Sequence, residues 1–335
     1  MGQSTLQKLI SLPTFFLSIF LMYWSLPLCT LCGYLRLLDF KSTRKDMYNW
    51  CRFMTRLFRI KVKKYGSKSL RKDAGRHILY LCNHRSWTDF FLDAYLTEGN
   101  ASLMSRWLVF AVFPVFIVSV IVLRGVILFK RGTILDKEKF NRWLDSKILS
   151  TPIPGVLVYP EGHRSLADKS LPLKRGMLYY AHSRKFPVQI IISRNKEDVL
   201  SEKTMKAHFG ATIITGCSDL IESDGKDIKV FLSEIQAAWD DLWEKVYAAD
   251  ATALPPLEQS NIPEFDYSMG MRVKQLLVVC SSVLVFLAAM VVFGKLSCLI
   301  YAAMGDTERK VLVTLILYVW FFVSMLNSRA PSATQ

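Results

Sequence analysis

Residues 78–89 read Ile-Leu-Tyr-Leu-Cys-Asn-His-Arg-Ser-Trp-Thr-Asp, an apolar run followed at once by polar residues. The apolar run is typical of a short buried strand, and the polar residues after it indicate a turn. Residues five positions apart on one continuous helix differ in direction by about 140°, so His84 and Asp89 cannot share a helical face. They can meet if His84 lies in the turn and Asp89 in the first turn of a following helix. The stretch therefore predicts a strand, a turn and a helix in succession.

The pairing of His84 with Asp89 has a chemical and a structural interpretation. A neutral imidazole accepts a proton from an alcohol, and a carboxylate bonded to its other nitrogen fixes the tautomer. The pair is therefore a candidate general base with its supporting acid. Ser86 and Asp89 also match a helix capping box, in which Asp89 bonds only the backbone. The spacing alone leaves both interpretations open.

Further strands and helices surround this stretch. Short apolar or β-branched runs precede turns at residues 155–159, 188–192 and 211–215, and helical patterns lie between or after them. The clearest helical pattern uses Ile228, Phe231, Ile235, Trp239, Leu242 and Val246. Alternating strands and helices predict an α/β domain over residues 61–249, with a mixed sheet flanked by helices.

A second polar turn follows the run at 155–159, where residues 159–165 read Tyr-Pro-Glu-Gly-His-Arg-Ser. Its proline and glycine mark a tight turn at the end of a strand, where open α/β sheets bind ligands. Arg164 offers a planar guanidinium that suits phosphate, and Ser165 is a further donor. Glu161 is expected to orient Arg164 or to bond a ligand hydroxyl. An ordinary polar turn with a surface Glu161–Arg164 pair is the alternative.

Two other segments contribute candidate binding residues. Residues 125–132 read Gly-Val-Ile-Leu-Phe-Lys-Arg-Gly, a predicted strand that ends in two cations. Arg131 is a candidate ligand for phosphate, and the alternative is a basic residue that simply ends a strand. Pro187 and Val188 stand at the head of the strand at 188–192 and are expected to form a wall, not to take part in the chemistry. Lys174 and Arg175 precede a possible helix start that would favour phosphate.

Composition favours contact with lipid. The 335 residues include 43 Lys and Arg against 28 Asp and Glu, a formal charge of +15, with 51% hydrophobic residues and a mean hydropathy of +0.24. A basic chain suits nucleic acid or anionic lipid, and the apolar excess favours lipid, so we expect no nucleic-acid partner. The seven cysteines are not spaced for zinc and are expected to be reduced, which fits a cytosolic domain.

The N-terminal part is predicted to lie in and on the membrane. The uncharged run from Leu9 to Leu35 is long enough to cross a hydrocarbon core of roughly 30 Å, so residues 1–36 are interpreted as an anchor. Residues 37–60 are basic, with apolar residues at helical spacing, which favours an interfacial helix on anionic headgroups. These apolar residues are Met47, Trp50, Met54, Leu57 and Phe58. A helix packed on its own domain is the alternative.

Three later segments complete the organisation. Residues 107–123 are uncharged but short for a span, so a membrane-dipping or buried helix is preferred to a spanning one. Residues 250–272 hold three prolines and indicate a linker. Residues 273–335 contain two long apolar runs separated by charges, which predict a transmembrane helical hairpin. The basic residues after the anchor place the catalytic domain in the cytosol, and the hairpin returns the C-terminus to that side.

Together and in this order, these segments resemble the glycerolipid acyltransferase family, which includes the 1-acylglycerol-3-phosphate acyltransferases. The family's Asn-His-x4-Asp block matches Asn83 to Asp89. Its Glu-Gly-Thr-Arg block matches Glu161 to Arg164, except that His163 replaces the threonine. A further block corresponds to Gly125, Phe129 and Arg131. The resemblance covers about residues 61–215.

The resemblance implies that His84 takes the proton of an acceptor hydroxyl while Asp89 holds the imidazole. The oxygen then attacks acyl-CoA, which is a co-substrate, so neither a bound cofactor nor a metal is expected. The residues implied to bind the acceptor phosphate are Glu161, Gly162, Arg164, Arg131 and Ser165. Those implied to form a wall for acyl-CoA or the acceptor are Asn83, Pro187 and Val188.

The expected acceptor is lysophosphatidic acid or a related lysophospholipid, in phospholipid biosynthesis or remodelling. Glycerol 3-phosphate, lysocardiolipin and lysophosphatidylinositol are alternative acceptors, and the replacement at His163 leaves this choice open. The alternative of another class is a non-catalytic membrane scaffold that binds lipid. The expected setting is an integral membrane protein of the endoplasmic reticulum, with the catalytic domain facing the cytosol.

Overall fold

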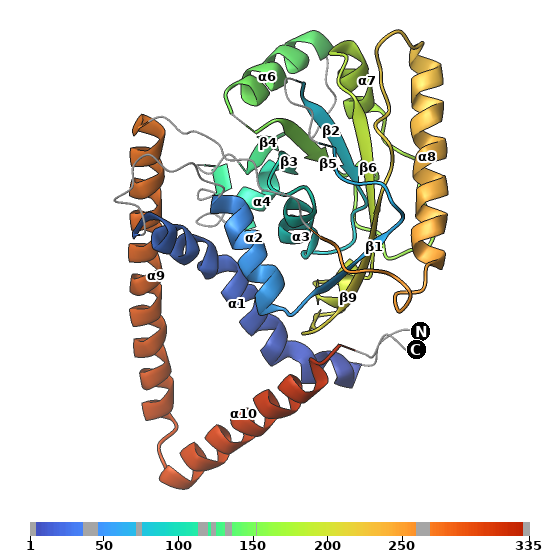
Figure 1. Cartoon of the computed structure of the whole chain (residues 1–335). Helices are drawn as coiled ribbons and strands as arrows, with labels where there is room; N and C mark the ends of the chain where they lie inside the picture. The colour runs from blue at the N-terminus through green and yellow to red at the C-terminus, as the bar shows by residue number, and fades with distance from the viewer. Residues whose placement is uncertain are drawn as a thin grey trace.

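The computed structural model describes residues 5–35, 46–71, 76–112, 120–121, 125–130, 136–151, 153–258 and 269–330. Its centre is a seven-stranded sheet with helices on both faces (Figure 1). The strands of this sheet are β1 (Lys61–Tyr65), β2 (Ile78–Cys82), β3 (Ala101–Arg106), β4 (Val126–Phe129), β5 (Gly155–Val158), β6 (Val188–Arg194) and β9 (Thr212–Cys217). β7 (Leu200–Ser201) and β8 (Lys206–Ala207) pair separately. The helices are α1 (Thr5–Leu35), α2 (Asp46–Leu57), α3 (Asp89–Leu96), α4 (Trp107–Val112), α6 (Lys137–Leu149), α7 (Gly176–Ser183), the short η1 (Lys196–Asp198), α8 (Ile228–Ala248), α9 (Met269–Ala303) and α10 (Thr307–Asn327).

The sheet is mixed, as the sequence predicted. Its strand order is β1-β9-β6-β2-β5-β3-β4. The five strands from β6 to β4 are parallel, whereas β9 runs antiparallel to β6 and β1 runs with β9. Parallel neighbours end at the same edge, so the segments that follow these five strands leave the sheet on one side.

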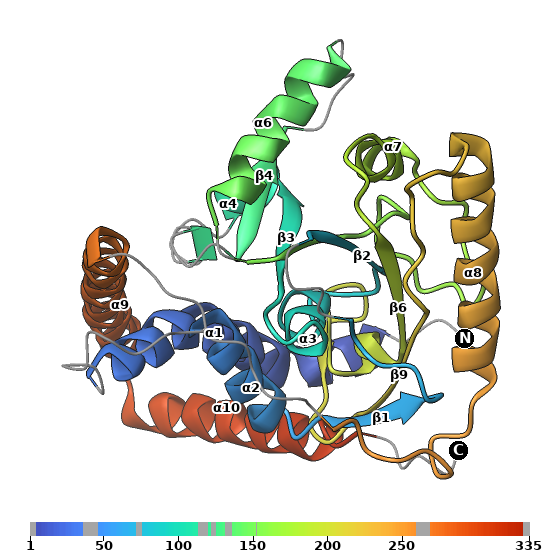
Figure 2. The ribbon, with the colours of Figure 1, turned by 45° about the horizontal axis from the view of Figure 1, so that its top comes forward.

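β2 is buried along its whole length because helices cover both of its faces. Tyr80 and Cys82 belong to the core that includes α1, α2 and α3. Leu79 and Leu81 belong to the core that includes α7 and α8. This alternation follows from the two-residue period of a strand. In the turned view α3 and α8 lie on opposite sides of the sheet (Figure 2). The polar turn after β2 therefore starts from a rigid strand.

α2 packs on the core of the protein. Trp50 and Met54 of the helix and Phe58 directly after it are fully buried. Phe58 stacks on Phe91 of α3 with ring centroids 5.8 Å apart, and Trp50 Nε1–H donates to Ser25 Oγ of α1 at 2.9 Å. The interpretation that this apolar face rests on headgroups is wrong, because α1 and α3 cover it. The alternative of a helix packed on its own domain describes α2.

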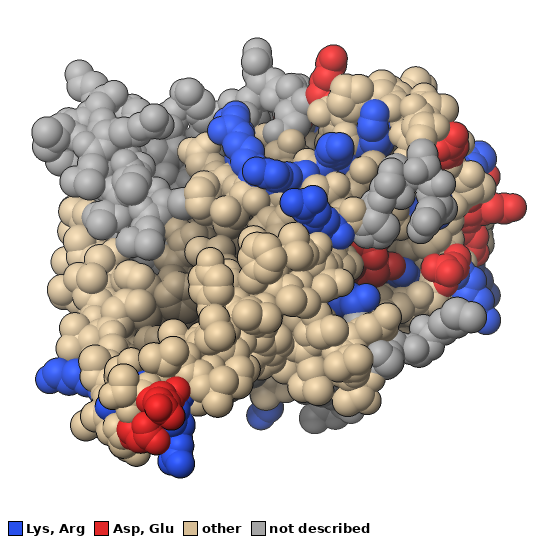
Figure 3. Space-filling model, turned by 90° about the horizontal axis from the view of Figure 1, so that it is seen from below, with Lys and Arg blue, Asp and Glu red and all other residues tan. Residues whose placement is uncertain are grey.

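The described part of the chain has three helices long and apolar enough to cross a membrane, Thr5–Leu26, Cys280–Ala303 and Thr307–Asn327. They lie where the anchor and the C-terminal hairpin were predicted. α9 and α10 diverge from the turn that joins them (Figure 1). Seen from below, the molecule shows a broad face with few charged side chains, bordered by Lys and Arg and by Asp and Glu (Figure 3). Such a face is consistent with contact with hydrocarbon.

α1 differs from α9 because one side of it packs on the α/β domain. Phe15 stacks on Trp87 with ring centroids 6.1 Å apart, and Trp87 belongs to the turn that leads from β2 to α3. Thr14 N–H donates to Ser324 Oγ of α10 at 3.1 Å. The N-terminal helix therefore contacts both the C-terminal helix and the first polar turn.

Two predicted segments fall partly outside the described residues. α4 supplies the start of the helix expected at 107–123, with Trp107 and Leu108 exposed, but residues 113–119 and 122–124 are not described. The linker follows β1 as far as residue 258, and Leu257 N–H donates to Val62 O at 2.8 Å. α9 begins at Met269, earlier than the predicted hairpin.

Gly155 begins β5 at a place where no side chain fits. A Cβ there would lie 2.5 Å from Tyr80 Cε2 and 2.8 Å from Asn100 O. Gly155→Ala should therefore lower the free energy of unfolding by about 1–3 kcal/mol, as overpacking does elsewhere. Gly176→Ala is the matched control, because a Cβ there meets nothing within 4 Å. Thermal unfolding of both variants in one detergent tests this, and equal midpoints would contradict it.

Candidate active site

The turns after β2 and β5 meet at the edge where the parallel strands end. His84 N–H donates to Glu161 Oε2 at 2.6 Å, and Ser165 N–H donates to His84 O at 2.9 Å. Ser165 Oγ accepts Ala167 N–H at 3.1 Å, so its hydroxyl also supports the second turn. β2 and β5 are adjacent and parallel. The two polar turns predicted from the sequence are therefore bonded to each other.

His84 and Asp89 form a close pair. Nδ1 of His84 lies 2.6 Å from Asp89 Oδ2. The His84 ring stacks on the Tyr159 ring, with centroids 4.1 Å apart and an interplanar angle of 14°. The His84 side chain is 25% exposed, whereas that of Asp89 is 2% exposed. The imidazole is thus held at one nitrogen and on one face, and within the described residues its Nε2 has no protein partner.

Asp89 also holds the turn that carries His84. Its Oδ2 accepts the backbone N–H groups of Arg85 at 2.6 Å and Ser86 at 3.1 Å. Ser86 Oγ accepts Thr88 N–H, and Thr88, not Ser86, directly precedes α3. Only the carboxylate half of the predicted capping box is therefore present. Asp89 satisfies both interpretations, because one oxygen bonds the backbone and the imidazole.

A buried charge cluster, which the sequence analysis missed, lies behind this pair. Lys196 opens η1 after β6, and its side chain is fully buried. Its Nζ lies 2.6 Å from Asn83 O, 2.9 Å from Asp93 Oδ2 and 3.1 Å from Asp89 Oδ1. Tyr159 Oη donates to Asp93 Oδ2 at 3.0 Å. A second acid within a short apolar helix was the available signal for Asp93, but nothing local marks Lys196 as buried.

The charges of this cluster shift one another's pKa. Burial raises the pKa of Asp93 to about 7, although Lys196 acts in the other direction. Burial also opposes ionisation of Asp89, but Lys196 and His84 hold the pKa of Asp89 below its ordinary value. Burial alone would lower the pKa of Lys196, and the two carboxylates hold it above its ordinary value. Asp89 is therefore ionised at neutral pH and can fix the proton on Nδ1.

Asn83 joins β2 to β6 and does not form a wall. Its side-chain amide exchanges two hydrogen bonds with the Ser193 backbone, at 2.8 and 2.9 Å. Arg85 is buried too, and its Nε donates to Glu197 at 3.0 Å. These bonds tie the turn after β2 to the end of β6. The predicted role of Asn83 as a wall for acyl-CoA or the acceptor is wrong, because the residue is fully buried.

Pro187 and Val188 lie at the opposite edge of the sheet. Val188 pairs with Leu79 in the parallel ladder between β6 and β2, so it is level with the start of β2. His84 comes after the other end of β2, which at about 3.3 Å per residue places it more than about 10 Å away. Both residues are buried where β6 begins. The predicted wall at Pro187 and Val188 is therefore wrong.

Glu161 does not orient Arg164. Arg164 Nη1 lies 2.8 Å from Glu202 Oε1, while Glu161 is buried beneath the turn and bonds His84. The alternative of a surface Glu161–Arg164 pair is therefore also wrong. Burial raises the pKa of Glu161 to about 7. Its Oε1 is buried without a partner among the described residues, which fits a carboxyl group that is partly protonated at neutral pH.

Cationic side chains surround the Gly162 turn. Gly162 has a φ of +76°, a conformation that favours glycine, and its carbonyl accepts Arg106 Nη2–H at 2.9 Å. A Cβ on Gly162 would lie 3.3 Å from Lys174 Cγ, so Lys174 lies against the turn. Arg106 ends β3 and Lys130 follows β4, both at the same edge as His84. Arg106 was not among the residues predicted from the sequence, and Arg131 lies outside the described residues.

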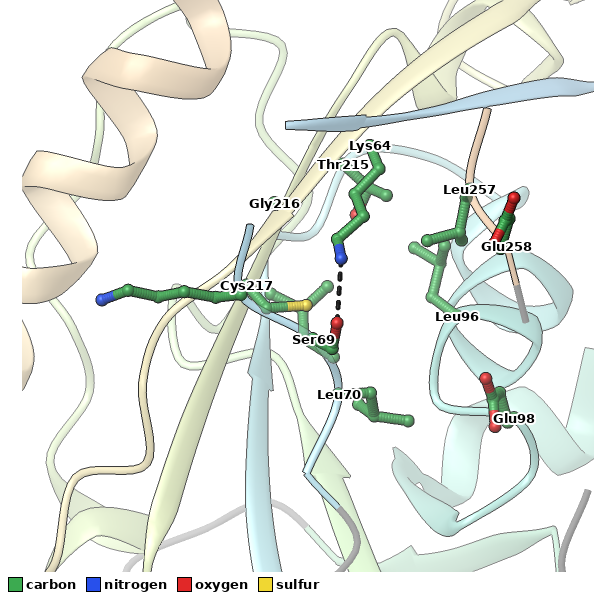
Figure 4. Close-up of a pocket in the computed structure, with 12 residues that line it drawn as sticks. Lys64, Ser69, Leu70, Leu96, Glu98, Thr215, Gly216, Cys217, Leu257 and Glu258 are labelled. Carbon is green, nitrogen blue, oxygen red and sulfur yellow. Dashed lines mark hydrogen bonds between the residues drawn. The ribbon is translucent and has the colours of Figure 1, made fainter. Parts of the chain in front are cut away.

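A separate cavity of about 90 Å³ lies at the far end of α3 (Figure 4). Lys64 of β1 reaches across it and donates to Ser69 Oγ at 2.8 Å. Its wall includes Leu96, the last residue of α3, whereas Asp89 is the first residue of that helix. The cavity is therefore distinct from the site at His84.

Comparison with known proteins identifies the domain. Residues 61–193 match the protein-family model described as Acyltransferase. The fold is similar to the crystal structure of the 1-acyl-sn-glycerophosphate (LPA) acyltransferase PlsC from Thermotoga maritima, with a TM-score of 0.54 and 14% identity, over 72% of this chain and 96% of that one. No curated protein matches the sequence. The predicted resemblance to glycerolipid acyltransferases is confirmed by the match of residues 61–193 to this family model and by the shared fold.

Glu161→Gln should remove a pH-dependent loss of stability. The pKa of Glu161 is about 7 in the folded protein against an ordinary value of 4.5, so the folded state binds the proton more strongly. Stability therefore falls as pH rises through this window, by about 3 kcal/mol in total. The variant should unfold at a higher temperature than wild type at pH 8 and differ little at pH 5.

Glu244→Gln is the control, because Glu244 is exposed on α8 and should give the wild-type midpoint at both pH values. Thermal unfolding of the three proteins in detergent measures the effect. A Glu161→Gln protein that follows wild type across the whole range would show that Glu161 binds no extra proton on folding.

Proposed function

We propose that the protein transfers a fatty acyl group from acyl-CoA to the free hydroxyl of lysophosphatidic acid or a related lysophospholipid. The carrying observation is the His84–Asp89 pair, bonded at 2.6 Å within an acyltransferase-family domain, with the imidazole partly exposed. The fold shared with an LPA acyltransferase supports this class of acceptor. An acceptor panel that includes glycerol 3-phosphate, lysocardiolipin and lysophosphatidylinositol distinguishes the alternatives.

In the proposed reaction His84 Nε2 accepts the proton of the acceptor hydroxyl while its oxygen attacks the thioester carbonyl. Asp89 keeps Nδ1 protonated and stabilises the imidazolium that forms. The tetrahedral adduct then collapses with cleavage of the carbon–sulfur bond, and the imidazolium returns its proton to the CoA thiolate. The products are the acylated phospholipid and free CoA, with no covalent enzyme intermediate.

The acceptor phosphate is proposed to bind at the Gly162 turn. Arg164 is 33% exposed and paired with Glu202, so phosphate can compete for its guanidinium. Arg106 and Lys174 lie against the same turn. Arg131, which follows Lys130 at the end of β4, is expected to add a further cation. A bidentate arginine suits phosphate better than a lysine does.

The membrane is proposed to supply the lysolipid and receive the product. The exposed apolar side chains of α9 and α10 would lie in hydrocarbon, and the Phe15–Trp87 stack places α1 beside the catalytic turn. We place the domain on the cytosolic face of the endoplasmic reticulum, where acyl-CoA is available. Activity in sealed microsomes should then need no detergent, and activity that appears only after permeabilisation would contradict this orientation.

Replacing the general base should abolish turnover without unfolding the protein. His84→Ala should lower kcat by about a hundredfold to ten-thousandfold, the usual contribution of a general base. Asp89→Asn should be severe as well, because an amide favours the wrong imidazole tautomer. His182→Ala is the control, since His182 lies on α7, away from the site, and its ring bonds the backbone carbonyl of Lys226.

Transfer of radiolabelled acyl groups from acyl-CoA to lysophosphatidic acid, with products identified, measures these effects. Near-wild-type turnover by His84→Ala would disprove the mechanism. Wild-type protein that binds anionic vesicles but acylates none of the acceptors would favour the scaffold instead.

Arg164 provides a test of the phosphate site. Arg164→Ala should raise KM for the acceptor and lower kcat/KM by about thirtyfold to a hundredfold, as for a lost charge-assisted bidentate bond, while KM for acyl-CoA changes little. Arg164→Lys should recover only part of the loss. Glu202→Gln removes the ion pair seen here but leaves the guanidinium for phosphate. If Arg164 serves only to pair with Glu202, Arg164→Ala and Glu202→Gln will lose the same amount of activity.

A further inference from the structure

Lys196 belongs to none of the sequence blocks on which the proposed function rests. Its side chain is fully buried, and a buried ammonium is costly unless it is bonded and paired. The ammonium donates to Asn83 O at 2.6 Å and to Asp93 Oδ2 at 2.9 Å, and it forms an ion pair with Asp89 Oδ1 at 3.1 Å. Its three N–H donors bond Asn83 O and both carboxylate oxygens of Asp93, the second at 3.1 Å, whereas Asp89 Oδ1 lies within ion-pair distance but accepts no hydrogen bond from the described residues. Each of its three partners lies on the catalytic turn or on α3.

The two oxygens of Asp89 have different partners. Oδ2 faces His84 Nδ1 and two backbone N–H groups, while Oδ1 faces Lys196. Lys196 also lies 5.9 Å from the centroid of the Tyr159 ring, which stacks on His84. Lys196 therefore contacts two groups that in turn contact the His84 imidazole, the Asp89 carboxylate and the Tyr159 ring.

We propose that Lys196 is a positioning residue for acyl transfer, because its ammonium keeps the buried Asp89 ionised and aligned on His84. Asp93 holds the ammonium in place and balances its charge. This inference rests on the proposed function, since it gives Lys196 a part in the same reaction. Because its side chain is fully buried, we assign Lys196 no contact with substrate, and it acts through Asp89.

The charge environment of Asp89 shows what would follow from loss of Lys196. The described charged and titratable groups that face Asp89 are Cys82 of β2, His84 and Arg85 of its own turn, Asp93 of α3, Tyr159 and Glu161 after β5, and Lys196 of η1. The Arg85 side chain is paired with Glu197. Without Lys196, Asp89 and Asp93 would be two buried acids beside each other, and such a pair retains a proton at neutral pH. Asp93, whose pKa is already raised, takes up that proton first, and loss of the cation also raises the proton affinity of the His84–Asp89 pair, so the pair becomes protonated at higher pH.

The pH dependence of turnover separates this role from a structural one. In Lys196→Met the acid limb of kcat/KM should move to higher pH by at least about one unit, and activity below it should fall about tenfold per pH unit. KM for both substrates should stay within about twofold. Asp93→Asn is the matched control, because it disturbs the same buried cluster but keeps the cation. Its acid limb should lie at or below the wild-type pH.

A purely structural Lys196 would reduce the yield of folded enzyme in both variants and leave the acid limb in place. A Lys196→Met enzyme with the wild-type limb would overturn the inference. If that variant does not fold, Lys196→Met/Asp93→Asn replaces it, because one unpaired acid remains instead of two. Its limb should lie at higher pH than that of Asp93→Asn, and equal limbs would overturn the inference.

Failure of the proposed acyl transfer can be told apart from failure of the role proposed for Lys196. If wild type acylates none of the acceptors, the acyl-transfer proposal fails, and the pH dependence of His84 modification by diethyl pyrocarbonate takes the place of turnover. Peptide mass spectrometry follows the modification of His84 in wild type and in the same variants. Its pH midpoint should rise when Lys196 is replaced and should lie at or below the wild-type value when only Asp93 is replaced. An unchanged midpoint in Lys196→Met would show that Lys196 does not control protonation of the His84–Asp89 pair.

Discussion

Asp89 is a nearly buried carboxylate, and in that position it stays ionised only if it accepts hydrogen bonds and its charge is paired. The tight turn after β2 meets the first need by presenting two backbone N–H groups, and Lys196 meets the second. Lys196 is available because β6 lies beside β2, runs parallel to it and ends at the same edge. The Asn83–Ser193 bonds fix the two strand ends to each other. The arrangement of β2 beside β6 thus keeps the buried Asp89 carboxylate ionised.

The membrane helices are attached to this same region. α1 packs along α2 and places Phe15 on Trp87, inside the turn that carries His84. It also bonds α10 through Thr14 and Ser324, so the first and last helices meet beside the catalytic domain. Most of the apolar length of α9 is exposed, although Phe286 packs against Phe20 and Trp24 of α1. The apolar side of the molecule and the site are therefore neighbours, which suits a reaction on a molecule that lies in a bilayer.

Sequence predicted the local features well and the long-range ones poorly. The strand, turn and helix around His84 and Asp89 follow from apolar periodicity and turn chemistry, which are properties of adjacent residues. Asn83 looked like a site residue because it precedes His84, yet its burial depends on Ser193 in another strand. Pro187 and Val188 lie on the strand that neighbours β2 but at its other edge, and strand direction cannot be read from an apolar run.

The same limit explains α2 and Lys196. The apolar stripe with Trp50 has the period of any amphipathic helix, and such a stripe fits a protein core as well as a lipid surface. Lys196 stands among polar residues, where a solvated side chain is the usual expectation. Its burial follows from Asp89 and Asp93, about a hundred positions earlier in the chain. Paired buried charges leave no local pattern in the sequence.

The polar turns after β2 and β5 differ in how their charges are balanced, and this difference indicates a different role for each turn. Around Asp89 each buried charge has an opposite partner, since an uncompensated charge there would cost several kcal/mol. Around Gly162 the cations Arg106 and Lys174 lie nearer to solvent, and the acid of that turn, Glu161, is buried and partly protonated near neutral pH. Positive charge left unbalanced near the surface is cheap and attracts anions. Proton transfer is therefore suited to the compensated, buried turn and anion binding to the open, cationic one.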